Sequence, residues 1–290
     1  MSPEEYCRIK VAPEGSSLYY ALLFAPREQR LALLGLAAFR AEVLEIPNEV
    51  SDAGVGAVKL TWWQEELVRL SDGQPRHPVT QALASCVHSN AFSIDGLNEV
   101  IEAARMDLEY GSYPTLRELT LYCHRAGGGV ADLARRLSHD QGAEAAAFAH
   151  DLAIGLELTR MLRHLRRDLA AGRCYIPNDE LSIRGLTSEA LLKDSSSEAA
   201  RSVIAQQARR AQQFLNSAVN RLSHDARGQH RYGLILAVLY RALVQSIEQD
   251  NRSVVTHQHH LTPLRKLWLA WRTARAPHRV CADEKDNKAT

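Results

Sequence analysis

Three side chains between Arg160 and Asp168 have the spacing by which one helix presents several groups to a single ligand. Arg160, His164 and Asp168 stand at positions i, i+4 and i+8 of a stretch with helical character, and residues four apart lie on the same side of a helix. The row combines a cation, an imidazole and a carboxylate, which can bind an anion or a metal ion. Gly172 then predicts the end of this helix.

A dense set of arginines surrounds this row: Arg160, Arg163, Arg166, Arg167 and Arg173. Guanidinium groups hold phosphates and carboxylates through paired hydrogen bonds, so the cluster is suited to direct binding of an anionic head group. A solvated helix face explains the same spacing equally well. Both interpretations therefore stay open.

The carboxylate and histidines allow a metal site, but simpler interpretations exist. Asp168 and His164, joined by Glu45 from a facing helix, can ligate a transition metal. Pairing of Asp168 with a neighbouring arginine, and a satisfied or solvated His164, are the simpler alternatives. His257, His259 and His260 lack cysteines and regular spacing, so a polar loop is favoured over a zinc site there.

The composition is that of a globular protein. Of 290 residues, 46% are hydrophobic and 24% charged, which allows a sizeable core. The 35 basic and 34 acidic side chains leave a net charge of +1, which removes the electrostatic argument for nucleic acid as a partner. The five scattered cysteines suggest neither a disulfide framework nor a zinc ribbon. With no signal-peptide pattern and no apolar run of about 18 residues, we expect a cytoplasmic protein, with peripheral membrane contact left open.

Helical periodicity and capping residues predict an all-α chain. Helices are expected from 18 to Pro26, from 27 to about 46 with Pro47 as the break, from 51 to a turn at 73–78, and then over 77–90, 94–109, 115–138, 143–171, 187–193, 196–223, 228–251 and 262–274. No linker or repeat divides them. We therefore expect a polar lead-in at 1–15, one all-α domain over 16–275 and a disordered tail at 276–290.

Aromatic residues add two expectations. Trp62 and Trp63 are expected to pack in the core. The last helix carries apolar residues opposite its cations, so it can lie on a membrane surface or close the bundle. Docking on the bundle is favoured because ordinary amphipathic helices do so. The apolar residues concerned are Leu264, Leu267, Trp268 and Trp271, and the cations are Arg265, Lys266 and Arg272.

The order and spacing of six segments resemble the squalene/phytoene synthase family. These segments are Ser17–Tyr20 with Pro26–Arg30, Ala38–Phe39, Lys59–Leu67, His77–Leu83, Leu121–Gly127 and Asp168–Pro177. The resemblance covers residues from about 16 to 240. It implies a single-domain isoprenoid-synthase helical bundle around a central cavity, in enzymes that join two prenyl diphosphates head to head.

The family binds its diphosphates through Mg²⁺ ions held by two aspartate-rich motifs on facing helices. In this chain the slots of the first motif hold Leu44, Glu45 and Asn48, and those of the second hold Arg160, His164 and Asp168. Arginine cannot ligate a metal and repels one. We therefore expect no cofactor, with Mg²⁺ required only if the chain is an active prenyltransferase.

The resemblance also implies a substrate or anion site at Ser17, Tyr20, Arg160, Arg173 and Tyr175. Arg173 and Tyr175 lie on the turn that this chain shares with the family. Ser17 and Tyr20 serve equally well as a helix N-cap and a core aromatic residue.

The altered motifs resemble those of a divergent branch, the mitochondrial complex I assembly factors and their bacterial relatives, and Thr262–Arg272 resembles the ending of that branch. The leading hypothesis is a non-catalytic family member that binds an isoprenoid, another lipid or a protein partner and assists assembly of a respiratory complex. One alternative is an active head-to-head prenyltransferase using Glu45, Asn48 and Asp168. Another is an interaction scaffold with an empty cavity. The sequence leaves open whether the protein is an enzyme.

Overall fold

The computed structural model describes residues 1–88, 94–138, 140, 142–249 and 259–281. Across these ranges the chain forms α-helices with short 3₁₀ and π turns and no strand, and one isolated β-bridge joins Ser112 to Cys174. The predicted all-α class is confirmed.

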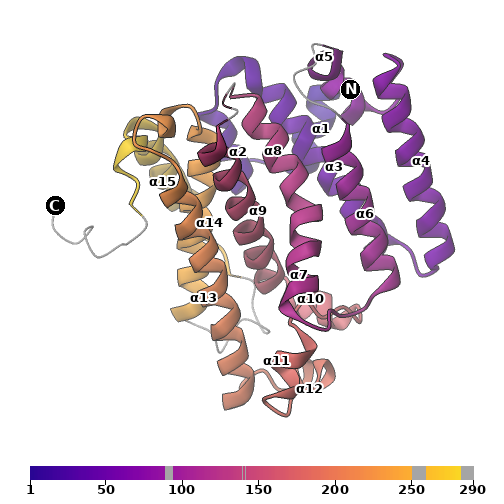
Figure 1. Ribbon diagram of the computed structural model, residues 1–290, viewed down its shortest axis with the longest axis vertical. Helices are drawn as coiled ribbons and strands as arrows, with labels where there is room; N and C mark the ends of the chain where they lie inside the picture. The colour runs from indigo at the N-terminus through magenta and orange to yellow at the C-terminus, as the bar shows by residue number, and fades with distance from the viewer. Residues whose placement is uncertain (89–93, 139, 141, 250–258, 282–290) are drawn as a thin grey trace.

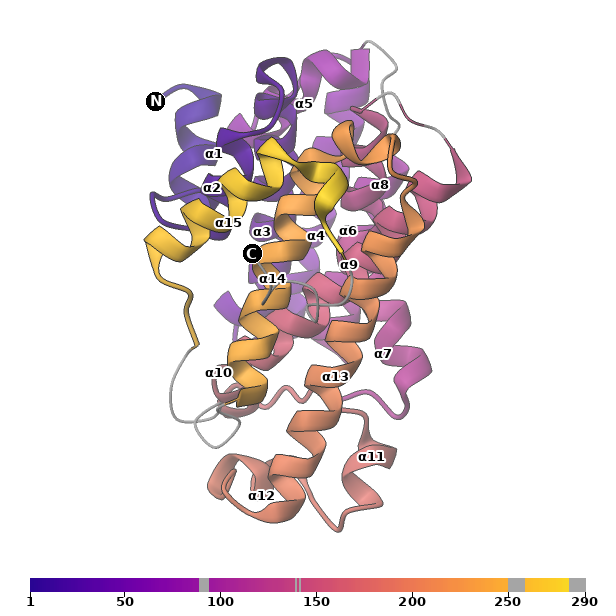
Figure 2. The ribbon, with the colours of Figure 1, turned by 90° about the vertical axis from the view of Figure 1, so that its left-hand side faces the viewer.

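The helices divide around α9, Ala143–Arg163 (Figure 1). On one side are α13, Glu198–Arg221, and α14, Arg231–Gln249, while α15, Pro263–Arg275, lies across the outside of α14 and α2 (Figure 2). The helices that precede α9 in the chain are α1 (Pro3–Val11), α2 (Ser17–Leu23), α3 (Arg30–Glu49), α4 (Ala53–Ser71), α5 (Pro78–His88), α6 (Asp95–Glu109), α7 (Leu116–Cys123) and α8 (Gly129–Arg136). Three short helices, α10 (Leu165–Ala170), α11 (Asn178–Ser182) and α12 (Ser188–Lys193), follow α9.

Two predicted helix starts rest on side-chain caps. The Ser16 hydroxyl accepts a hydrogen bond from the Tyr19 amide at 3.0 Å, and the Asp52 carboxylate accepts from the amides of Gly54 and Val55 at 2.7 and 3.1 Å. These caps satisfy amides that have no partner within the first turn. They fix the starts of α2 and α4 close to the predicted positions.

Pro47 does not end its helix, contrary to the prediction. Helix α3 continues to Glu49, with Ile46 and Pro47 both buried in its last turn. A proline removes one backbone donor and disturbs one turn, and here the burial of this turn keeps it helical.

The first 15 residues, expected as a polar lead-in, contain helix α1, whose Cys7 is buried against the bundle.

Two long predicted helices are interrupted. The expected helix over 115–138 contains a π-helical turn at His124–Gly128, and the expected helix over 143–171 ends at Arg163, with His164 outside helical geometry at φ −107° and ψ 12°. Neither break follows from the apolar periodicity, because the segments before and after each break bury the same face of the helix. The break at His164 lies in the middle of the proposed ligand row.

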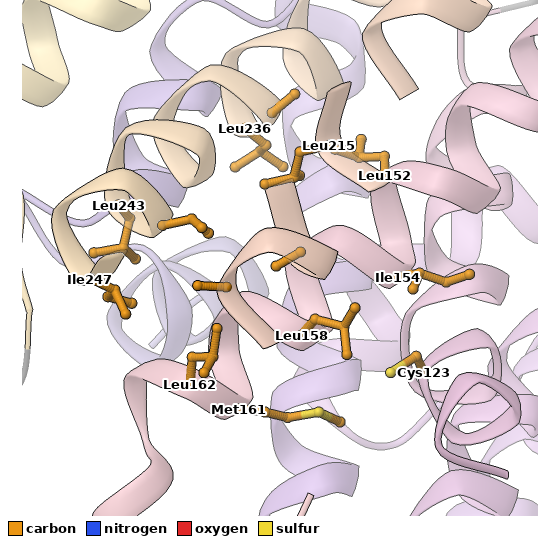
Figure 3. Packing of buried hydrophobic residues seen from close by; sticks show 14 of the residues in the cluster. Cys123, Leu152, Ile154, Leu158, Met161, Leu162, Leu215, Leu236, Leu243 and Ile247 are labelled. Atoms are coloured by element: carbon orange, nitrogen blue, oxygen red, sulfur yellow. The ribbon is translucent and has the colours of Figure 1, made fainter. Parts of the chain in front are cut away.

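Among the residues that the structure describes, the buried hydrophobic side chains form two clusters. In Figure 3, Leu152, Leu215 and Leu236 come together where α9, α13 and α14 meet. The second cluster lies among α3, α4, α5 and α6, and Leu44 and Tyr232 contact both clusters. Leu44 belongs to α3 and Tyr232 to α14, so the two clusters meet between these helices.

The prediction for the tryptophan pair is correct only for Trp63. Trp63 is 5% exposed, whereas Trp62 is 41% exposed and its ring meets Trp63 edge to face. Adjacent residues of a helix point in different directions, so only one of them faces the core.

Over the part of the chain that is described, no helix has both the length and the apolar character needed to span a bilayer. Of the expected tail at 276–290, residues 277–279 form a 3₁₀ turn and those from 282 onward lie outside the described residues. His257 also lies outside them.

Close contact between α6 and α8 makes Gly129 sensitive to substitution. A Cβ on Gly129 would lie within 2.8 Å of the Gly96 backbone. We expect Gly129→Ala to lower the free energy of unfolding by about 1–3 kcal/mol, because backbone cannot move aside as a side chain can. Urea denaturation measures this. Gly228→Ala, where a Cβ meets nothing within 4 Å, is the control, and equal effects would contradict the packing argument.

Candidate functional site

A cavity of about 290 Å³ lies at the junction of the two core clusters. Helix α9 runs along it from Phe148 to Arg160, a rise of about 18 Å at 1.5 Å per residue. The middle of the wall is apolar and is formed by Leu33 and Leu36 of α3, Leu152 and Leu156 of α9, and Leu236 of α14. Elongated apolar cavities of this kind hold apolar ligands.

A buried carboxylate lies between two arginines at one end of the cavity. Arg40 of α3 donates to Glu157 and, through Nε, to the Ala126 carbonyl at 2.9 Å. Arg160 donates from Nε to Glu157 Oε2 at 2.9 Å. Glu157 is 3% exposed, and all three side chains line the cavity. Two guanidinium groups against one carboxylate leave this trio with a net positive charge.

The charges of the trio set the protonation of Glu157. Burial raises the pKa of Glu157, but the Arg40 and Arg160 guanidinium groups outweigh this effect and hold the pKa below its ordinary value. The carboxylate is therefore ionised at neutral pH, and the link between α3 and α9 is a charged one.

The opposite end of the cavity is also polar, but its groups already have partners. His230 Nε2 lies 2.9 Å from Asp140 Oδ2, and Arg135 donates to Asp132 at 2.8 and 2.7 Å. An apolar middle thus separates two polar ends. The end near Arg160 is the one that adjoins the proposed ligand row.

Asp168 is paired with an arginine, as the simpler interpretation has it. Asp168 is 2% exposed, and its Oδ1 accepts from Arg167 Nε and Nη2 at 3.0 and 2.7 Å. Among the described residues its Oδ2 has no hydrogen-bond partner, and Nη1 of Arg160 lies 3.9 Å away. The helix break at His164 thus leaves Asp168 close to Arg160, which lines the cavity.

His164 is unsuited to cationic chemistry. Burial, together with the charges of Arg167, Arg160 and Arg163, lowers the pKa of His164 to about 3. The imidazole is therefore neutral at physiological pH.

Tyr175 belongs to a buried cluster that sequence reasoning did not anticipate. Asp107 accepts hydrogen bonds from the hydroxyl groups of Tyr113, Tyr122 and Tyr175 at 3.1, 2.7 and 2.8 Å. Burial raises the pKa of Asp107 although these hydroxyl groups favour its ionised form. The guanidinium carbon of Arg160 lies 5.4 Å from the centre of the Tyr175 ring. Tyr175 thus presents its ring, with its hydroxyl already engaged, beneath Arg160.

The remaining slots of the two motifs have separate partners. Arg173 donates to the Pro47 carbonyl at 3.1 Å and to the Asn48 side chain, and Glu45 accepts from Lys10 at 2.7 Å. Among the described residues, no group of three or more histidine, cysteine, aspartate or glutamate side chains is placed to hold a metal ion.

The arginines of the proposed cluster point to different places. Arg160 lines the cavity and Arg173 joins the end of α3, while Arg167 is bound to Asp168. Arg163 contacts His260 at 3.0 Å, and Arg166 is exposed. Arg40, which lies outside the sequence-based set, is the second arginine at this end of the cavity.

The two candidates at the start of the fold lie outside the cavity wall. Ser16, rather than Ser17, caps α2, and Tyr20 is a core residue that is 8% exposed. Their neighbour Leu18 is the residue of this segment that lines the cavity. Of the five proposed binding residues, only Arg160 is among the residues of the cavity wall.

One sequence feature pointed to the missed residues. Glu157 stands three positions before Arg160, on the same helix face, in a stretch that is otherwise mostly apolar. A charged residue in such a stretch needs a buried partner. Arg40 could not be recognised as that partner, because only the tertiary structure brings α3 against α9.

Removing the charge of Glu157 is expected to destabilise the protein. Glu157→Gln leaves Arg40 and Arg160 without their counter-ion, and breaking a buried pair costs about 3–5 kcal/mol. Because the folded-state pKa of Glu157 is lowered, its contribution is present above the ordinary glutamate pKa of about 4.3 and is lost as pH falls through the folded pKa. Urea denaturation at pH 7 and below pH 4 should therefore show a difference that shrinks with acid.

The control for this variant is Glu65→Gln. The Glu65 side chain is 62% exposed and lies 3.7 Å from Arg69, so a change within about 0.5 kcal/mol is expected. Equal effects of the two substitutions on the free energy of unfolding at pH 7 would show that the charge of Glu157 stabilises the fold no more than an exposed charge does.

His164 is expected to make the fold acid-sensitive. The unfolded chain binds a proton at this histidine below about pH 6.5, while the folded chain does so only near pH 3. Stability should therefore fall as pH drops from about 6.5 towards 3, and His164→Gln should flatten this slope. Thermal unfolding across this pH range measures the effect. The exposed His224 provides the control substitution, and an unchanged slope in His164→Gln would refute the expectation.

Comparisons with known proteins agree with this architecture. A model of the squalene/phytoene synthase family matches residues 11–268. The chain is 27% identical over 278 residues to a 15-cis-phytoene synthase from Synechococcus elongatus, covering 91% of this chain and 89% of that protein. It is also 27% identical over 270 residues to the chloroplastic phytoene synthase of Daucus carota, covering 90% and 67%.

Solved structures of low sequence identity share the fold. A squalene synthase from Alicyclobacillus acidocaldarius superposes with a TM-score of 0.74 at 23% identity, covering 86% of this chain and 94% of that one. A dehydrosqualene synthase in complex with ligand gives a TM-score of 0.80 at 18% identity, covering 94% and 95%. The match to the family model covers most of the sequence, and this chain belongs to the squalene/phytoene synthase family.

Proposed function

We propose that this protein binds an isoprenoid or another lipid in its apolar cavity and does not condense prenyl diphosphates. The observation that carries the proposal is the trio at the cavity end, where Arg40 and Arg160 hold one carboxylate, Glu157. The excess positive charge and the guanidinium geometry suit a ligand with an anionic head group bound directly. The apolar wall between the two ends suits its chain.

The proposal includes the absence of a Mg²⁺ requirement. It is supported by the pairing of Glu45 with Lys10, of Asn48 with Arg173 and of Asp168 with Arg167. Each of these three side chains already contacts a cationic side chain, and the neighbouring arginines would repel a metal ion.

We further propose that the protein acts through a protein partner in the assembly of a respiratory complex. The support is the sequence resemblance to complex I assembly factors, in which the fold is kept and the aspartates are lost. In this role a bound lipid would stabilise the cavity rather than undergo reaction.

The alternative is an active head-to-head prenyltransferase. Two observations favour it: similar proteins are named phytoene synthases, and Asp168 Oδ2 is a buried oxygen without a hydrogen-bond partner. Asp168, Asn48 and Glu45 would have to be rearranged to share Mg²⁺ ions. The third candidate is an interaction scaffold with an empty cavity. Product formation and ligand binding distinguish these three candidates.

Purified protein incubated with Mg²⁺ and farnesyl or geranylgeranyl diphosphate is expected to form neither squalene nor phytoene. In calorimetry, geranylgeranyl diphosphate should bind with the same heat in Mg²⁺ and in EDTA. The Asp168→Ala variant should likewise give equal binding heats in Mg²⁺ and in EDTA. Formation of either hydrocarbon would overturn the proposal, and the absence of any binding heat would favour the empty scaffold.

A cavity-filling variant tests where the ligand lies. Ala37 of α3 lines the cavity, so Ala37→Phe should abolish the binding heat, and native mass spectrometry should show any co-purifying lipid lost. Ala146→Phe, at an exposed position of α9, adds the same ring outside the cavity and should bind as the unmodified protein does. Equal binding by both variants would place the ligand elsewhere.

A further inference from the structure

Helix α15 has two apolar faces. Leu269, Ala270 and Thr273 are buried on the side that packs against the bundle, in agreement with the expected docking. The opposite face carries large apolar side chains that remain exposed: Leu264 at 79%, Leu267 at 40%, Trp268 at 51% and Trp271 at 47%. Their spacing of i, i+3, i+4 and i+7 aligns them in one stripe along the helix.

The edges of this stripe are cationic. Arg272 lies over the Trp268 ring at 4.7 Å and Arg275 over the Trp271 ring at 5.6 Å. Within the range Pro263–Arg275 there are four basic residues and no carboxylate. Lys266 donates to the Gly15 carbonyl at 2.8 Å and so helps to hold the helix in place. Glu14, the neighbour of Gly15, is an exposed carboxylate close to this end of the helix.

We propose that α15 docks this protein on the surface of a membrane that contains anionic lipids. Leucine and tryptophan side chains bury well at the boundary of head groups and acyl chains, and neighbouring arginines pair with anionic head groups. Charge complementarity favours this partner, because the helix offers cations alone. In Figure 2, α15 lies across the outside of α2 and α14. The exposed fractions of Leu264, Trp268 and Trp271 place the stripe on the solvent side of the helix.

The docked helix would also bring the cavity close to the bilayer. Lys266 binds Gly15, which lies in the segment that joins α1 to α2. The residues that flank this segment, Val11 and Leu18, line the cavity. The segment between α1 and α2 therefore contacts the membrane-facing helix and is flanked by residues of the cavity wall. Passage of a lipid from the bilayer into the cavity rests on the proposed function. The docking of α15 on the membrane does not.

Co-sedimentation of the full chain with vesicles tests the docking. Binding is expected to vesicles of phosphatidylcholine mixed with phosphatidylglycerol, to be weaker with phosphatidylcholine alone, and to fall as salt is raised. The double variant Trp268→Ala, Trp271→Ala should bind at least about tenfold more weakly, a factor that corresponds to only about 1.4 kcal/mol.

Trp62→Ala is a matched control. Trp62 is 41% exposed and has the guanidinium of Arg69 5.6 Å from its ring centre, but it belongs to α4, far from α15 (Figure 1). This variant should bind vesicles as the unmodified protein does. Equal loss in both tryptophan variants, or no binding to anionic vesicles, would overturn the proposal.

Three further measurements keep the test independent of folding and of the cavity. Arg265→Gln with Arg275→Gln leaves the apolar stripe intact and should weaken both the binding and its salt dependence. Ala37→Phe should leave vesicle binding unchanged, so failure of the lipid-cavity proposal and failure of membrane docking give different results. Brominated lipids should quench the fluorescence of Trp62→Phe protein, and absence of quenching would contradict insertion of Trp268 and Trp271.

Discussion

The burial of Glu157 between Arg40 and Arg160 is the interaction on which the site depends. A buried carboxylate is costly unless its charge and its hydrogen bonds are satisfied. Arg40 meets this requirement from α3 and Arg160 from α9, so the two helices that flank the cavity must approach at this level. Arg40 also binds the Ala126 carbonyl in the π-helical turn. One ionic trio thus joins three segments at one end of an otherwise apolar space.

A second polar cluster holds the turn that follows α10. Tyr175 reaches Asp107 of α6, while Arg173 reaches Pro47 and Asn48 at the end of α3. Two residues of a single turn are therefore bound to two different helices. This turn belongs to one of the segments that carry the family resemblance, and in this chain it joins α6 and the end of α3.

The cavity and helix α15 fit one physical description. Both combine apolar surface with arginines: Arg40 and Arg160 at the cavity end, Arg272 and Arg275 along the exposed stripe. Guanidinium groups are weakly hydrated and pack on aromatic rings, so they tolerate apolar surroundings better than ammonium groups do. An amphipathic ligand with an anionic head group matches both places.

The sequence by itself determined most of the helices, two of their caps and the family, but not α1 or α11. Apolar periodicity predicts helices regardless of what they pack against, and Ser16 and Asp52 cap locally. The loss of aspartates from both motifs stays a prediction, made from residue identity at the spacing of the family resemblance. The breaks at His124–Gly128 and His164, and the continuation of α3 past Pro47, depend on packing, which periodicity does not record. The pairing of Glu157 with Arg40, and of Asp107 with three tyrosines, joins residues far apart in the chain. Only the tertiary structure decided these contacts, because the cost of burying a charge depends on which distant side chain is present to neutralise it.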